Sequence, residues 1–198
     1  MSHDSELDAF DADKPRPHLD LNTIDGLESF IERMVPLMRS NLERDGELMP
    51  FAVICGKRDP RDGSALKQPE PIIVALAVPM RNDGDKDTVR AALDDAISKT
   101  NGVGIAFVTE AWAVSYEAEP GLFHDFYNQR PSQHPNRIEI VSIVCEHRTG
   151  ASASFFQIPI LRDGDKVTLG EPQKNRMPRI PTGGRFNDFF GLAREIQA

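Results

Sequence analysis

Apolar residues between positions 22 and 45 recur at spacings of three and four, the period of one face of an α-helix. The members of this stripe are Leu27, Phe30, Ile31, Met34, Val35, Met38 and Leu42. Asn22 or Thr23 can cap the first turn, and Asp45-Gly46 supplies a stop. Pro36 removes one backbone hydrogen bond, so we expect a kink or a helix in two pieces.

Two short apolar runs after this helix are typical of strands. They cover residues 51–55 and 72–78, and the polar stretch between them contains glycines and prolines. This order predicts an antiparallel hairpin with a long tip. Asp87 can cap a second helix that ends at Gly102. Its apolar face consists of Val89, Ala92, Leu93, Ala96 and Ile97.

Residues 103–116 form the longest strand candidate, and both of its alternating faces are largely apolar. A strand of this kind belongs in the middle of a sheet that the two helices cover from opposite sides. Further strands are expected at 138–147, 153–161 and 167–169, with a turn at 162–165. A last helix would carry Phe186, Phe189, Phe190, Ala193 and Ile196 on one side.

The resulting order is α-β-β-α-β-β-β-β-α, which predicts an α+β fold. We expect a mainly antiparallel sheet of about five to six strands with two to three packed helices. The chain has 198 residues, of which 39% are hydrophobic and 27% are charged. This composition suits one ordinary domain, expected at 22–198, and excludes a collagen-like, coiled-coil or disulfide-scaffold protein.

The N-terminal residues 1–21 differ from the rest in charge. They hold six of the 31 acidic residues against Lys14 and Arg16, and Pro15 and Pro17 prevent a regular helix. We expect a disordered acidic tail, with an interaction tail as the alternative. No apolar signal segment or membrane-length apolar run is visible, so we expect a cytoplasmic protein without a membrane segment.

The two cysteines, Cys55 and Cys145, each lie inside an apolar strand-like run. They lack CxxC spacing, which disfavours a zinc or thioredoxin-type site. Cys145 and His147 would point the same way on a strand, but we interpret Cys145 as a core residue rather than a nucleophile.

The candidate for chemistry is Glu110, a carboxylate in an otherwise apolar strand. Such a group is costly to bury unless it is paired or protonated. Arg137 begins the next strand and could bind Glu110 in two parallel hydrogen bonds, and Glu139 would point the same way as Arg137. The three would form a cluster beneath Trp112. It is either an acid/base pair or an ion network that fixes the register of the strands.

The segment Thr109-Glu110-Ala111-Trp112, followed after a loop by Pro135-x-Arg137-x-Glu139 and an apolar strand, resembles a family of uncharacterised small bacterial proteins. The resemblance extends to the opening helix with its Arg44-Asp45-Gly46 turn and covers roughly residues 27–169. The family has no assigned activity. The resemblance therefore supports the fold and implies no mechanism.

A long insert, residues 117–136, joins the two halves of this pattern and is rich in aromatic residues. Phe123, Phe126 and Tyr127 would either pack on the sheet over Trp112 or form a contact surface for a partner. His124, His134 and His147 show none of the spacings typical of metal ligands, so no metal site is expected.

A basic arm rich in proline and glycine is expected at 172–185. Its bases are Lys174, Arg176, Arg179 and Arg185. The arm could bind an anion in front of the last helix, but the residue order of a phosphate-binding P-loop is missing. A pI near 5.1 disfavours nucleic acid as a partner.

No motif defines a substrate or a cofactor. We therefore predict a non-catalytic cytoplasmic accessory or protein-binding domain without a cofactor. Its candidate binding residues are Trp112, Phe123, Phe126, Tyr127, Arg176, Arg179 and Arg185. The alternative is an acid/base hydrolase that uses Glu110, Arg137 and Glu139.

Overall fold

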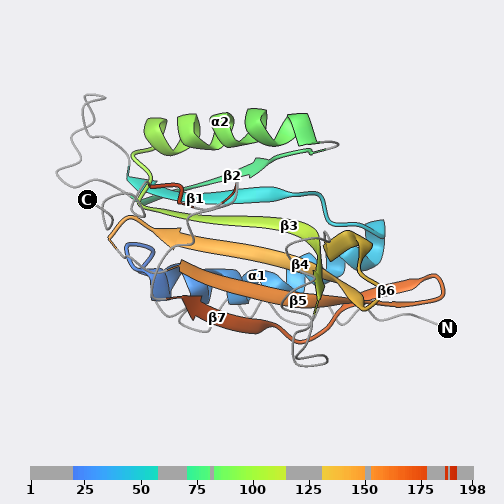
Figure 1. The fold of residues 1–198 in the computed structure, drawn as a ribbon. Coiled ribbons are helices and arrows are strands. Elements are labelled where there is room, and N and C mark those ends of the chain that lie inside the picture. Colours follow the sequence, from blue (N-terminus) through green and yellow to red (C-terminus); the bar gives the residue numbers. More distant parts are fainter. Residues whose placement is uncertain are drawn as a thin grey trace.

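The structure, a computed structural model, describes residues 20–57, 71–80, 83–114, 131–149, 153–177, 186 and 188–190 (Figure 1). The elements in chain order are α1 (Ile24–Asp45), β1 (Phe51–Lys57), β2 (Pro71–Ala77), α2 (Asp83–Lys99), β3 (Gly104–Val114), a short 3₁₀ helix (Pro131–Gln133), β4 (Arg137–His147), β5 (Ala153–Asp163), β6 (Lys166–Leu169) and β7 (Gln173–Met177). The predicted tail falls almost entirely on residues outside these ranges.

The described part of the chain is an α+β fold with two α-helices and an antiparallel sheet, as the sequence predicted, but the sheet has seven strands rather than five to six. The strand order is β2-β1-β3-β4-β5-β6, and β7 also pairs with β5. The β1–β2 hairpin has the expected antiparallel register, with Phe51 opposite Ala77. β3 lies inside the sheet between β1 and β4, which confirms the prediction from its two apolar faces.

Helix α1 begins and ends as the capping residues predict. The Thr23 hydroxyl accepts a hydrogen bond from the Gly26 amide at 3.1 Å. Gly46 closes the helix in the left-handed region, with φ 78°, and its amide donates to the Leu42 carbonyl. The helix runs unbroken through Pro36, so of the two alternatives the helix in two pieces is wrong, and the kink stays a prediction. Buried residues on both sides of Pro36 hold the two halves on the same face of the sheet.

The two helices cover opposite faces of the sheet, and each closes its own core (Figure 1). The core beneath α1 contains Leu27, Ile31 and Met38 of the helix, with Val108, Ile143 and Phe156 of the strands. The core beneath α2 contains Val89, Leu93 and Ile97, with Ile54, Ile105 and Phe107. Burial of both apolar stripes drives this three-layer arrangement.

Two predicted boundaries need correction. Helix α2 begins at Asp83 rather than after Asp87, because acidic residues are favourable in the positively charged first turn of a helix. The predicted basic arm is a strand over Gln173–Met177, where it pairs with β5. Pairing supplies partners for backbone groups that an isolated arm would leave to water.

The start of the predicted last helix packs on the core beneath α2 without helical structure at the described positions. Phe186 stacks on Phe107 with a centroid distance of 4.4 Å, and Phe189 is buried. The buried carboxylate of Glu146 accepts hydrogen bonds from the amides of Asp188 (2.6 Å) and Phe189 (2.7 Å). Burial raises the pKa of Glu146 to about 7, although these two bonds oppose the shift. Ala193 and Ile196 lie outside the described residues.

Candidate functional site

The candidate site lies at the start of β1, where the neighbouring strand β3 extends beyond the end of β1. Phe51, the first residue of β1, is opposite Val108, so the last six residues of β3 pair with β4 but not with β1. The segment between α1 and β1 runs beside this step. A hollow of about 540 Å³ opens there, lined by Glu47, Leu48, Met49, Pro50, Pro79, Met80, Lys86, Thr109 and Glu110.

Glu110 lines this hollow and takes its hydrogen bond from the backbone. One carboxylate oxygen accepts from the Leu48 amide at 2.6 Å. Burial raises the pKa of Glu110 above its usual value, against the effect of that bond, and the nearby carboxylates of Glu139 and Glu47 contribute to the shift.

The predicted bidentate pair between Glu110 and Arg137 does not form. Glu110 is opposite Val141 in the register of β3 and β4, while Arg137 is opposite Val114. Four positions along a strand separate the two backbones by about 13 Å. The register of the strands therefore keeps the two charged groups apart.

Arg162 of β5 is the cation that pairs with Glu139. Its guanidinium donates to both carboxylate oxygens, at 2.7 and 3.0 Å, and also to the carbonyl of Gly46 at 3.3 Å. This ion pair links the end of α1 to β4 and β5. Sequence analysis missed Arg162 because it was assigned to a turn, whereas β5 continues through Asp163.

Arg137 instead covers Trp112, with its guanidinium carbon 4.9 Å from the ring centroid. A cation–π contact at an exposed site favours one arrangement of the ring and the guanidinium by about 0.5–1 kcal/mol. Trp112 is 43% exposed, although it sits on a strand opposite Glu139. We call Trp112 and Arg137, with the adjoining Glu139–Arg162 pair, the tryptophan surface.

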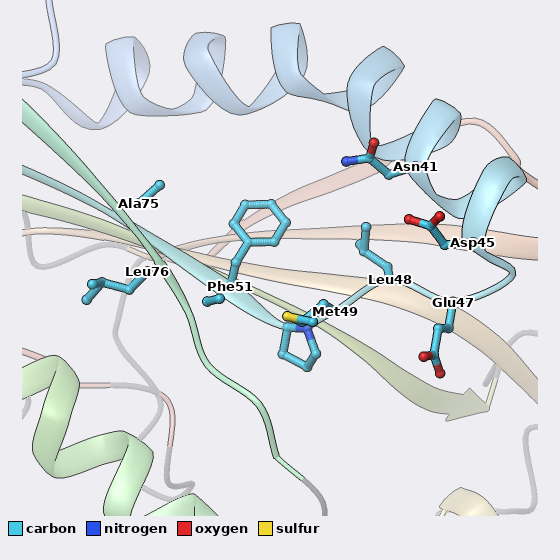
Figure 2. A pocket seen from close by; sticks show the side chains of 10 residues that line it. Asn41, Asp45, Glu47, Leu48, Met49, Phe51, Ala75 and Leu76 are labelled. Atoms are coloured by element: carbon cyan, nitrogen blue, oxygen red, sulfur yellow. The ribbon is translucent and has the colours of Figure 1, made fainter.

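A second hollow, of about 270 Å³, shares Glu47, Leu48, Met49 and Pro50 with the first. Figure 2 shows Asn41 and Asp45 on α1 above it and Phe51, Ala75 and Leu76 on the strands beside it. Met49 is 61% exposed and stands between the two hollows. The chain therefore has two adjoining concave regions around one loop.

The bases of β7 are held within the chain. Arg176 donates to Glu28 at 2.6 Å, and Lys174 donates to Glu28 at 3.2 Å and to Glu32 at 2.8 Å. Arg176 also binds Asp25. Burial opposes ionisation of Glu28, but hydrogen bonds from Ser154, Arg176 and Lys174 outweigh it and hold the pKa of Glu28 below its usual value.

Sequence analysis also missed Glu28 as the buried partner of the β7 bases, although a signal for it was present. It lies on the apolar stripe of α1, one residue after Leu27 and three before Ile31, and is only 4% exposed. An acid on the buried face of a helix requires partners from the sheet. The other predicted binding residues, Phe123, Phe126, Tyr127, Arg179 and Arg185, lie outside the described residues.

Both cysteines are buried, as predicted. Burial raises the pKa of the Cys55 thiol to about 11 and also raises that of Cys145, which disfavours the nucleophilic thiolate form of both at neutral pH. His134 is also buried, and its Nδ1 accepts from the Asn136 amide. The described residues contain no group of three or more histidines, cysteines and carboxylates that could hold a metal ion.

Comparisons with known proteins give no match: no family model, no curated protein and no solved structure is similar to this chain. The resemblance to the uncharacterised bacterial family therefore stays a prediction. Neither of the described helices has the length and apolar character needed to span a membrane.

Proposed function

We propose that this protein is a non-catalytic accessory domain that binds another protein, with the tryptophan surface as an anchor of the contact. The observation that carries the proposal is Trp112, a large ring that is 43% exposed and in cation–π contact with Arg137. Tryptophan and arginine dominate the residues whose truncation weakens protein interfaces most. A ring whose preferred arrangement is already favoured by such a contact loses less conformational freedom on binding than an uncontacted one.

The surroundings of Trp112 suit such a contact. Glu139, which is paired with Arg162, lies opposite Trp112 in the register of β3 and β4, and the exposed Met49 lies on the segment between α1 and β1. Methionine adapts its shape to a partner more readily than other apolar side chains. These features support recognition of a protein surface rather than of one small molecule.

The test is affinity capture with the tagged full-length protein and lysate of its source, with quantitative mass spectrometry of the captured proteins. Trp112→Ala and Arg137→Ala should reduce a specific captured protein at least tenfold. Leu37→Ala is the matched control, because Leu37 is exposed on α1 and should leave capture unchanged. Equal capture by the wild type and Trp112→Ala, with unaltered thermal unfolding, would contradict the proposal.

A second candidate function is an acid/base hydrolase, which one observation favours: Glu110 lines an open hollow and has a raised pKa. Against it, Glu139 is held by Arg162, and Arg137 covers Trp112. The catalytic role would require the variant Glu110→Gln to lose hydrolytic activity towards a panel of ester, amide and phosphoester substrates at an unchanged melting temperature. Absence of activity in the wild type would exclude hydrolysis of these substrates.

A further inference from the structure

β2 is an edge strand with an unusual composition. Its sequence, Pro-Ile-Ile-Val-Ala-Leu-Ala, has no charged or polar side chain, and its only strand partner in the described part of the chain is β1. Ile73 is 48% exposed, and Ala75 and Ala77 are exposed as well. Proteins normally protect such edges with charges, prolines or bulges, because an apolar edge pairs readily with other strands.

The backbone groups of these exposed residues point away from β1. The Val78 amide donates to the Pro50 carbonyl at 2.9 Å, so Val78 faces β1. Backbone direction alternates along an antiparallel strand, so Leu76 and Val74 also face β1. Ile73, Ala75 and Ala77 therefore present their amides and carbonyls to the outer edge.

The smaller hollow adjoins the same residues. Ala75 and Ala77 line it together with Phe51, on the face of the sheet that α1 occupies (Figure 2). A strand added beside β2 would direct every second side chain to that face. The backbone edge and the hollow thus form one docking site with hydrogen-bonding groups and apolar space.

Charge at one end of the hollow indicates the chemistry of its occupant. Asp45 and Glu47 lie at the end of the hollow away from Ala75 (Figure 2). β2 approaches this end at Ala77, which is opposite Phe51 at the start of β1. Arg44 binds Asp45, whereas the exposed Glu47 has no ion pair within the described residues. A basic side chain on the occupant would complement this end.

We propose that the β2 edge binds an extended segment of another protein as an added strand. The segment has apolar side chains at alternate positions and a lysine or arginine at the end beside Ala77. This site goes beyond the proposed function, because it uses backbone groups of β2 and does not require Trp112. Strand addition of this kind gains affinity from main-chain hydrogen bonds and specificity from the alternate side chains.

A second copy of this chain fits the edge less well. β2 carries no charge that could complement Glu47, and each copy has a net charge of -8. Two copies would therefore meet without an attractive charge pair and with overall repulsion. A basic partner segment removes both disadvantages.

The test uses a phage library of random decapeptides, selected on the full-length wild-type protein. We expect enriched peptides with alternating apolar residues and a terminal lysine or arginine. Ala75→Pro removes an outward amide without touching a bond to β1 and should abolish their binding, whereas Ala75→Ser keeps the amide and should bind as the wild type does. If Ala75→Pro fails to fold, Ile73→Lys places a charge on the same edge and should weaken binding at least tenfold.

Two further variants separate this site from its surroundings. Glu47→Gln should weaken the binding of a synthetic enriched peptide several-fold. The same variant should leave unchanged the binding of an analogue of that peptide that lacks the basic residue. Trp112→Ala should bind the peptide as the wild type does, even if capture of a protein by the tryptophan surface fails. The proposal is overturned by no enrichment, by equal binding to Ile73→Lys, or by a wild-type dimer that Ile73→Lys converts to a monomer.

Discussion

The two edges of the sheet differ in how they are protected. At one edge, β7 is short and polar, and its bases Lys174 and Arg176 reach inward to the buried carboxylate of Glu28 on α1. At the other edge, β2 is uncharged and its side chains at Ile73, Ala75 and Ala77 are exposed. Inward-pointing charges are a known means of preventing edge-to-edge association.

The difference indicates that one edge of the sheet contributes to stability and the other to recognition. The β7 edge joins the sheet to α1 through ion pairs between the buried Glu28 and the partly exposed Lys174 and Arg176. The β2 edge offers unpaired backbone groups next to a hollow. Changes at β7 should therefore alter folding, and changes at β2 should alter binding.

The largest effect is expected at the β7 edge from truncation of its buried partner. Glu28→Ala leaves Lys174 and Arg176 without the carboxylate that they share with Ser154. Lys174 keeps Glu32 and Arg176 keeps Asp25, so the loss comes from hydrogen bonds to a buried carboxylate, including that of the buried Ser154 hydroxyl. We expect the free energy of unfolding, measured with urea, to fall by about 3–4 kcal/mol. Glu32→Ala is the control, since that exposed carboxylate should contribute under about 1 kcal/mol. Equal losses in the two variants would contradict the role of Glu28.

The next effect is a pH dependence from Glu146, which lies near the end of the inner strand β4. Its pKa is about 7 in the folded protein against an ordinary 4.5. The folded state holds the proton more tightly, so stability from this group is present below pH 4.5 and is lost as the pH rises to about 7. The loss in the free energy of unfolding amounts to about 3 kcal/mol. Unfolding at pH 5 and pH 8 should show this loss in the wild type and not in Glu146→Gln.

The β7 edge should respond to pH with the opposite sign. Its ion pairs lower the pKa of Glu28, so the stability that they supply is present above pH 4.5 and is lost as the pH falls through the folded pKa. The wild type should lose more stability than Glu28→Gln on acidification from pH 5 to pH 3, as followed by urea unfolding. A parallel loss in both proteins would show that Glu28 is not the group responsible.

The smallest change in stability is expected from lysine substitutions on the two edge strands, and these variants distinguish the binding properties of the two edges. Ile73 on β2 and Met177 on β7 are exposed to similar extents, 48% and 42%. Lysine at either position should change the free energy of unfolding by under about 0.5 kcal/mol. Only Ile73→Lys should reduce binding of the enriched peptides in fluorescence anisotropy, so an equal reduction by Met177→Lys would refute a specific β2 site.

The order of the elements could be predicted because periodicity is a local property. The stripe of α1 and the two apolar faces of β3 follow from spacing alone. The pairing of charges could not be predicted, because it depends on strand register. Glu110 and Arg137 are near neighbours in the element order but are four positions apart in the ladder. Arg176 likewise finds Glu28 only because β7 folds back onto β5.

The most direct test of a recognition role is photo-cross-linking in the cells of origin, with benzoylphenylalanine placed at Ile73 or at Asn175. Both positions lie on edge strands, one on β2 and one on β7. If β2 is the recognition site of a protein-binding domain, we expect a discrete adduct with another protein at Ile73 and none at Asn175. No adduct at either position, or the same adducts at both, would contradict it.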